Sequence, residues 1–386
     1  MYQLYNTQSE ITTNLSNFIK KSFPNIRKTQ LNIIPSIVYG MIMAESSVSR
    51  DISNHLKDEF SLIQLDSVTK RIRRFFNNEL FDPYTFYDHI IRDVISKFKS
   101  KHHDSRVHII LDHMYSHNNY TVFMITMRLG KQGIPLWFRC FKGKNDSKAF
   151  HEQLLIEGVN YVHNLFDYSF NLIFLADRWF NSTSLMKHID SLGHTFCFRL
   201  KKNIKVLVYD KKEGHKVWKW LDDLKAYQYH SNLFENICIT DNLYPINLAI
   251  SKRQGVSDIW LIATNGDTKR AIKDYGYRYG AIECVFKNQK SNGFYIESIN
   301  NATLKSFTNM YTLVCFSTLF LTIIGADYSK NRKCYKKTKI TTHKNYTDKG
   351  KIRVLSLFNT GLTLFKLAVN SLVYIRIPYT FTLYDI

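Results

Sequence analysis

Two acidic residues in this chain follow short apolar runs, where their carboxylates could take part in chemistry. Asp112 ends the run Val107–Asp112, and Asp177 ends the run Asn171–Asp177. Apolar runs this short predict strands buried on both faces of a sheet, so each Asp would lie at the rim of the sheet. Two carboxylates brought together there repel each other unless a cation lies between them. The pattern therefore predicts half of a divalent-metal site.

A third carboxylate, Glu283, lies in a segment whose periodicity predicts a helix from Tyr275 to about Gly293. Lys290 follows two turns later on the same helix face, where it would hold a phosphate beside the metal. Two Asp and a Glu form an oxygen-only set, which suits the hard cations Mg²⁺ or Mn²⁺. Two such ions would activate an attacking water or 3′-hydroxyl and stabilise the leaving oxygen of a phosphodiester.

Each feature also has a plainer explanation. Asp177 could cap the helix that follows it, and Asp112 could begin a turn. The histidines at positions 102, 103, 108, 113 and 117 are spaced irregularly and lack partners at the distances of zinc sites, so we expect surface or phosphate-facing positions for them. The five Trp residues are expected in the core, although Trp260 or another aromatic of residues 201–270 could stack on an unpaired base.

The order of the predicted elements indicates how the carboxylates are positioned. Three strands, a helix, a strand, a helix and a strand follow one another in the α/β order of an RNase H-like fold, in which the first and fourth strands are neighbours. These elements are Val107–Asp112, Tyr120–Leu129, Ile134–Phe141, a helix from Ser147 to about Asn164, Asn171–Ala176, a helix from Asn181 or Ser182 to about Leu192, and Thr195–Leu200.

Five regions are predicted along the 386 residues. Residues 1–100 form a helical region, and residues 101–200 form the first part of the catalytic core. Residues 201–270 form a β-rich insertion of five short strands, and residues 271–326 complete the core with the Glu283 helix. Residues 327–386 hold a Lys-rich loop to position 353 and a last helix, Leu355–Val373. The loop is either solvated or tracks phosphates.

The N-terminal region resembles a helix-turn-helix unit of three short helices. Ser49 is predicted to cap the second helix, and Asp66 or Ser67 the third, which runs to Phe76. The third helix carries four basic residues that suit phosphate contact or insertion into a DNA groove: Lys70, Arg71, Arg73 and Arg74. The plainer alternative is a solvated basic face on a structural bundle.

Composition favours a nucleic-acid partner. The formal net charge is +21, from 53 Lys and Arg against 32 Asp and Glu, which favours a polyanion and nucleic acid before a membrane surface. Six Cys without a C-x-x-C pair indicate free thiols in a reducing compartment. The N-terminus has no signal-peptide pattern, and the apolar window Tyr311–Ala326 predicts a buried helix rather than a membrane span.

Together these motifs resemble the DDE transposases of bacterial insertion sequences, in the branch with a Tyr-x2-Arg-x3-Glu-x6-Lys signature. The resemblance covers roughly residues 30–330. It rests on Leu111-Asp112, on Leu175–Phe180, on Tyr275, Arg278, Glu283 and Lys290, and on the Lys-Ser-Asn-Gly-Phe tail that ends at Phe294.

The resemblance implies an RNase H-like catalytic core with a β-rich insertion and an N-terminal DNA-binding region. It implies that Asp112, Asp177 and Glu283 are catalytic and hold two Mg²⁺ (or Mn²⁺) ions, and that Tyr275, Arg278 and Lys290 contact terminal phosphates. The implied partners are double-stranded DNA, as terminal inverted repeats and target, and a second copy of the chain, without a membrane. The implied location is the bacterial cytoplasm, at the nucleoid.

One spacing departs from the family signature. Four residues separate Arg278 from Glu283, one more than in the signature. On a continuous helix this step places the two side chains about 140° apart instead of about 40°. Either the helix begins after Gly280 and the preceding loop restores Arg278, or Tyr279 takes the family position.

Three functions are compatible with these residues. The first is a DNA transposase that cleaves element ends and joins them to a target. The second is a transposase-derived DNA-binding regulator without catalysis, against which the three retained carboxylates argue. The third is an RNase H-like nuclease without strand transfer, which would need neither the N-terminal helices nor the basic C-terminal region.

Overall fold

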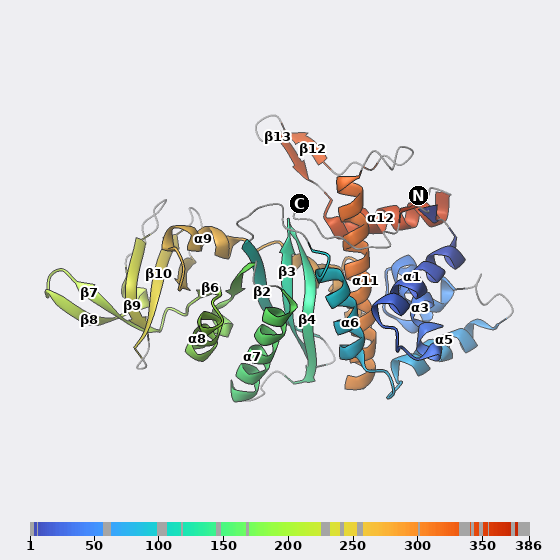
Figure 1. Cartoon of the computed structure of the whole chain (residues 1–386), viewed down its shortest axis with the longest axis horizontal. Coiled ribbons are helices and arrows are strands. Elements are labelled where there is room, and N and C mark those ends of the chain that lie inside the picture. Colours follow the sequence, from blue (N-terminus) through green and yellow to red (C-terminus); the bar gives the residue numbers. More distant parts are fainter. Residues whose placement is uncertain are drawn as a thin grey trace.

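The structure is a computed structural model of the whole chain (Figure 1). It describes residues 4–5, 7–56, 63–98, 106–116, 119–143, 148–166, 170–224, 232–239, 243–252, 258–299, 302–331, 340, 343–346, 350–353, 355–371 and 375–376. Ser147, His102, His103, His117 and Cys334, which were considered above, lie outside the described residues.

A ten-stranded mixed sheet forms the centre of the protein, in the order β4-β3-β2-β5-β6-β11-β10-β9-β7-β8. β2 pairs in parallel with β5, and β5 with β6. The other neighbouring pairs are antiparallel. Along the chain, this sheet begins with β2 (Arg106–Tyr115), β3 (Tyr120–Leu129), β4 (Gln132–Lys142), β5 (Asn171–Ala176) and β6 (Thr195–Arg199). The predicted RNase H-like α/β core with a mixed sheet is therefore confirmed.

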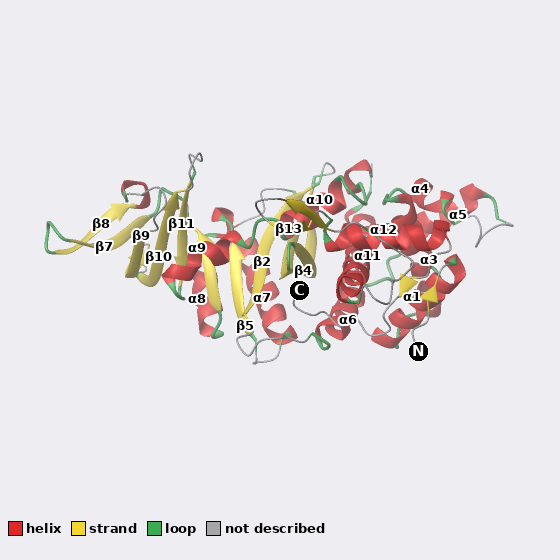
Figure 2. Ribbon diagram, turned by 90° about the horizontal axis from the view of Figure 1, so that it is seen from above, coloured by secondary structure: helices red, strands yellow, loops and turns green. Residues whose placement is uncertain are grey.

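The insertion extends the same sheet. The five predicted strands are present as β7 (Lys205–Asp210), β8 (His215–Trp220), β9 (Asn232–Ile239), β10 (Tyr244–Lys252) and β11 (Ile259–Thr264). β11 pairs with β6, so the insertion strands continue the catalytic sheet to one end of the molecule (Figures 1 and 2).

Helices cover both faces of the sheet. α7 (Lys148–Leu165) packs on one face, where Gly158 meets Ile125 and Trp137. α8 (Thr183–Ser191) follows it, with Ser182 as N-cap. α9 (Thr268–Gly276) and α10 (Ile282–Lys290) bury their apolar residues against Ile110, Ile173 and Leu175 on the other face. Side chains alternate along a strand, so Asp112 and Asp177 belong to this second face.

α11 (Leu304–Lys330) joins the two halves of the protein (Figure 1). It contacts β4 on the sheet side and α3, α5 and α6 on the other. It is the one helix in the described part of the chain that is long and apolar enough to cross a membrane, and its apolar window is entirely buried within the protein. The predicted buried helix is confirmed.

Within the described residues, the N-terminal region contains the helices α1 (Gln8–Ser22), α2 (Lys28–Leu31), α3 (Ile34–Ala44), α4 (Ser49–Asn54), α5 (Leu65–Phe76) and α6 (Pro83–Ile95). Two predicted caps are wrong. Val48 and Gln64 hold the N-cap positions of α4 and α5, because Ser49 and Asp66 already lie in the first turn. In the sequence, α4 ends at Asn54 and α5 begins at Leu65, a wider spacing than the short turn of a helix-turn-helix unit.

Other differences lie in the C-terminal half. The predicted helix from Tyr275 to Gly293 is two helices, α9 and α10, because Gly280 takes a left-handed φ of 84° between them. α11 continues to Lys330, into the predicted loop. That loop also holds a hairpin of β12 (His343–Tyr346) and β13 (Gly350–Arg353), ahead of α12 (Leu357–Ser371). β1 (Leu4–Tyr5) pairs with β14 (Ile375–Arg376).

The aromatic prediction is partly wrong. Trp137 is buried, but Trp179, Trp218 and Trp220 are 39%, 43% and 45% exposed. For Trp218 and Trp220, the sequence does not reveal which face of their strand another element covers. Among the described Cys, Cys140, Cys197 and Cys315 are buried and free, as expected, and Cys238 and Cys284 are half-buried.

α11 and α12 cross through two glycines. A Cβ on Gly325 would lie 1.9 Å from the carbonyl oxygen of Leu357, and one on Gly361 would lie 1.9 Å from that of Leu321. We expect Gly325→Ala to destabilise the protein by about 3 kcal/mol through overpacking, measured as a lower midpoint of urea unfolding.

Gly276→Ala is the matched control, because its nearest neighbour beyond the helix would be Trp260 at 3.9 Å, an ordinary contact. Equal unfolding midpoints for wild type and Gly325→Ala would contradict the close crossing.

Candidate active site

The parallel register of β2 and β5 places Asp112 and Asp177 side by side. Leu111 pairs with Ala176, the last residue of β5, so the two Asp residues come next on both strands. Asp112 is not the end of its strand as predicted. β2 continues to Tyr115 beyond the end of β5, with β3 as its partner. Asp112 therefore lies at the rim of the parallel part of the sheet.

The plainer role predicted for Asp177, a cap, is present, but Asp112 does not begin a turn because β2 continues to Tyr115. Asp177 caps the 3-10 turn η1 (Arg178–Phe180) by accepting from the Arg178 N–H at 2.7 Å. Asp112 Oδ1 accepts from the His113 N–H at 2.9 Å. Each carboxylate uses one oxygen in this way and retains acceptor capacity for another partner.

The pKa of Asp112 reflects both its burial and the charges around it. Burial raises the pKa of Asp112 to about 6, and the charges of Asp177 and Glu283 add to this rise. Arg278 and the His113 N–H oppose it. The two other acids repel the ionised Asp112 carboxylate, and a bound cation would relieve that repulsion.

Arg278 is the counter-charge that the structure provides. Its guanidinium Nη2 donates to Asp112 Oδ2 at 2.6 Å, and its side chain is 7% exposed. Burial alone would lower the pKa of Arg278, but Asp112, Tyr275 and Asp177 raise it above its ordinary value. The Arg278 Nε has no hydrogen-bond partner in the described part of the chain, so the guanidinium retains an unused donor.

The helix break explains the unusual spacing in the sequence. α10 begins at Ile282, after Gly280, and Arg278 lies in the connection from α9. The direction of the Arg278 side chain is therefore not tied to that of Glu283 by a continuous helix, and Arg278 contacts Asp112. The first of the two alternatives, in which the loop restores Arg278, is what the structure shows. Tyr279 instead stacks on Trp260, with ring centroids 5.4 Å apart.

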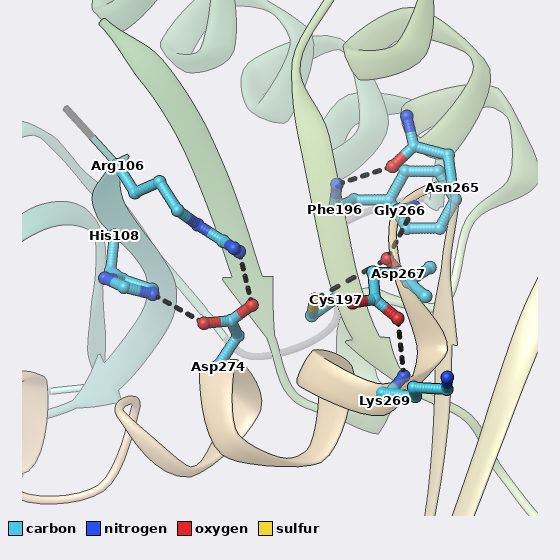
Figure 3. Close-up of polar contacts among 10 residues, drawn as sticks. Arg106, His108, Phe196, Cys197, Asn265, Gly266, Asp267, Lys269 and Asp274 are labelled. Atoms are coloured by element: carbon cyan, nitrogen blue, oxygen red, sulfur yellow. Dashed lines mark hydrogen bonds and ion pairs between the residues drawn. The ribbon is translucent and has the colours of Figure 1, made fainter. Parts of the chain in front are cut away.

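α9 is fixed at both ends (Figure 3). At its start, Asp267 accepts from the Lys269 N–H, and the preceding Asn265 accepts from the Phe196 N–H of β6. At its end, the buried Asp274 accepts from Arg106 at 2.5 Å and contacts His108 at 3.1 Å. Both partners of Asp274 lie on β2, so the strand that carries Asp112 also holds the helix that precedes Arg278.

The Tyr277 ring strengthens this connection. His108 contacts it edge-on with centroids 4.8 Å apart, and the Arg128 guanidinium lies 4.0 Å from its centroid. His108 is therefore a structural partner of Asp274 and Tyr277. The surface or phosphate-facing position predicted for it is wrong.

The two remaining signature residues already have surroundings of their own. Lys290 donates to the Tyr115 carbonyl at 2.7 Å and pairs with Glu297 at 2.9 Å. Tyr275 is fully buried, and its hydroxyl has no hydrogen-bond partner among the described residues. Burial raises the pKa of Tyr275, with Arg278 and Asp177 near enough to influence it. Phosphate contact by either residue stays a prediction.

An aromatic cluster beside the carboxylates was not foreseen. The His113 ring lies 4.4 Å from Trp179, and Trp179 lies 5.0 Å from His151, centroid to centroid. Burial and then His151 lower the pKa of His113 to about 4, so this ring is neutral at pH 7. The predicted surface position of His113 is wrong. Its place directly after Asp112 was the available sequence indication.

The basic residues of α5 lie on the surface. Val68, Ile72, Phe75 and Phe76 face the core, and the amphipathic spacing leaves the four basic residues exposed: Lys70, Arg71, Arg73 and Arg74. This arrangement fits both a DNA contact and a solvated face, so DNA binding by α5 stays a prediction.

The donor set fits a hard divalent cation in chemistry but is not closed around one point. Three carboxylates supply only oxygen, as Mg²⁺ or Mn²⁺ requires. Within the described residues, however, no group of three His, Cys, Asp or Glu lies close enough to hold one ion. Arg278 neutralises Asp112 in this arrangement, and the Glu283 side chain is exposed at the rim.

An RNase H-like sheet with two Asp at its parallel rim and a Glu on a following helix defines a class of enzymes that cleave and join nucleic-acid strands. Comparison with protein families matches residues 99–320 to the transposase DDE domain. The match covers more than half of the 386 residues, so this chain belongs to the DDE transposase family and has the function of a DNA transposase.

Further comparisons were made with curated sequences and with solved structures. No curated protein sequence matches the chain. Among solved structures, a cryo-electron microscopy structure of the piggyBac transposase synaptic complex with hairpin DNA is similar, with 14% sequence identity and a TM-score of 0.46. The alignment covers 94% of this chain and 78% of that chain.

The raised pKa of Asp112 gives a pH-dependent stability. The folded protein holds this proton more tightly than the unfolded chain, so the free energy of unfolding that Asp112 contributes falls as pH rises from about 4 to about 6. The shift corresponds to about 3 kcal/mol. Asp112→Asn mimics the protonated acid, so we expect the variant to gain about this much over wild type between pH 4 and pH 7.

The measurement is urea unfolding of both proteins across this pH range. The difference between the two proteins is the quantity to follow, because the lowered pKa of His113 acts in the opposite direction and is common to both. A difference that does not change with pH would contradict the burial of Asp112 among other carboxylates.

Proposed function

We propose that Asp112, Asp177 and Glu283 carry the catalysis of DNA cleavage at transposon ends and of strand transfer into target DNA. The observation that supports this is the register of β2 and β5, which sets Asp112 beside Asp177 at the rim that faces α10. The pKa of Asp112 responds to both Asp177 and Glu283, although Glu283 lies on a separate element.

Enzymes of the DDE transposase family use divalent metal ions. We propose Mg²⁺ or Mn²⁺, two per site, held by Asp112, Asp177 and Glu283. When bound, the ions would lower the pKa of the attacking water or 3′-hydroxyl and stabilise the leaving oxygen. The chain's own contribution is to place Asp112 beside Asp177 through the register of β2 and β5 and to bring Glu283 to the same rim on α10.

Arg278 would have two partners during this function. In the present arrangement it neutralises Asp112. When cations take over that neutralisation, its guanidinium and the unused Nε would be available to a DNA phosphate, for which a planar guanidinium is well suited. Lys290 would make a second phosphate contact after its ion pair with Glu297 breaks. The Tyr275 hydroxyl would make a third contact to the same terminal phosphates.

The proposed partners are double-stranded DNA, as terminal inverted repeats and as target, and a second copy of the chain on DNA, because two ends must be held together. The proposed location is the bacterial cytoplasm, at the nucleoid. The net charge of +21 supports DNA binding through phosphates.

The decisive experiment is cleavage of a duplex that carries the gene's own flanking ends, with Mg²⁺ or Mn²⁺. We expect wild type to nick at a fixed position, and Asp112→Asn, Asp177→Asn and Glu283→Gln to be slower by about 100-fold or more. Glu157→Gln is the control, since this carboxylate lies on α7 and pairs with Arg139. We also expect Mn²⁺ to raise the melting temperature of wild type but not of the three variants.

The outcomes separate the three candidate functions. Strand-transfer products support the transposase, and cleavage without them would indicate a nuclease. Specific DNA binding by wild type without cleavage would indicate a regulator that has lost the chemistry.

A second experiment addresses α5. If Lys70 and Arg74 contact phosphates, Lys70→Ala/Arg74→Ala lowers the slope of log affinity against log salt by about 2 for duplex DNA. Lys20→Ala/Lys21→Ala removes the same charge from exposed positions on α1 and is expected to leave the slope unchanged. Equal slopes for both variants would contradict a role of α5 in binding DNA.

A further inference from the structure

The hairpin of β7 and β8 exposes an aromatic face. Side chains alternate along both strands, so one face carries three residues from each strand. The β7 residues pair with the β8 residues in the register Lys205 with Trp220, Leu207 with Trp218, and Tyr209 with Lys216. Tyr209, Trp218 and Trp220 are 63%, 43% and 45% exposed. We call these six residues the hairpin face.

The opposite side of the hairpin accounts for its folding. Val206 and Val208 are buried there, and Lys219 pairs with Asp210. Val206 also lies opposite Ile239 of β9 in the sheet. The exposed aromatics of the hairpin face are therefore not needed to hold the hairpin on the sheet.

The hairpin face lies at the end of the molecule. β8 is the outermost strand of the sheet, and both views place β7 and β8 far from α11 and α12 (Figures 1 and 2). Among the described elements, only β8 and β9 pack extensively with β7. Three large aromatic side chains gathered on one exposed face indicate an interaction surface.

The charge of the hairpin face selects the partner. Lys205 and Lys216 lie on it, and none of its six residues is acidic. The Lys205 ammonium lies 4.7 Å from the centre of the Trp220 ring. A second copy of a chain with a net charge of +21 would bring further positive charge. An anionic partner with flat apolar groups fits both the lysines and the rings, and nucleic-acid strands have this chemistry.

The spacing of the rings favours unpaired bases. Trp218 and Trp220 are two residues apart on one strand, so their attachment points are separated by about 7 Å. This is about twice the 3.4 Å rise per nucleotide of a stacked strand. Rings so placed can take bases that have left the stack, whereas an intact duplex offers them only its edges and phosphates.

We propose that the hairpin face is a binding site for single-stranded DNA, in which Trp218 and Trp220 stack on unpaired bases and Lys205 and Lys216 contact the flanking phosphates. This site is separate from the carboxylates, and adds a contact for DNA strands opened during the proposed function. Its affinity needs neither metal nor cleavage.

The test is binding of a fluorescent oligothymidine of about 20 nucleotides to the full chain in EDTA, followed by anisotropy. Loss of stacking on two bases in Trp218→Ala/Trp220→Ala is expected to weaken binding by about 30-fold or more. Trp218→Phe/Trp220→Phe retains aromatic faces and is expected to bind within a few-fold of wild type. Binding to a duplex of the same length is expected to change little in either variant.

Three further observations decide the proposal. Glu157→Gln, on α7 and outside both sites, should bind the oligonucleotide as wild type does, and the absence of metal keeps this result independent of the catalytic proposal. Equal oligonucleotide affinity of wild type and the Ala variant, at matched melting temperatures, would overturn the site. The same holds if the Ala variant loses self-association in light scattering while oligonucleotide binding is kept, because the hairpin face would then join two copies of the chain.

Discussion

The register between two parallel strands is the constraint on which the rest of the site depends. Pairing of Leu111 with Ala176 sets Asp112 beside Asp177 on the face that α9 and α10 cover. A shift of one residue would turn one carboxylate to the opposite face, toward α7. Both strands are buried on their two faces here, with Ile110 and Leu175 on the face of the two acids and Leu111 and Phe174 on the other.

Placing these acids together at a partly buried rim creates a charge that must be neutralised. Arg278 does so here, and it can because the chain leaves the helix between α9 and α10. A continuous helix would have pointed Arg278 and Glu283 in different directions. The left-handed Gly280 therefore separates Arg278 from the helical phase of Glu283.

Two further structures keep this rim in place. Asp274 ties α9 to Arg106 and His108, so the strand that carries the first carboxylate also fixes the approach to Arg278. α11 carries the packing from β4 to the N-terminal helices, and its crossing with α12 leaves no room for a side chain at Gly325 or Gly361. The insertion strands prolong the sheet away from this centre, which leaves the hairpin face of β7 and β8 open to solvent.

The sequence by itself determined the strands, their order and the pairing of the two Asp, because short apolar runs between turn residues leave few other structures. The motif residues also identified the family. Features that depend on packing between distant parts of the chain were decided only by the tertiary structure. It broke the predicted helix after Gly276, joined Arg278 to Asp112, and placed the half-buried His113 beside Trp179. It also exposed Trp218 and Trp220, because the burial of a strand face depends on which element covers it, and no local pattern contains that information.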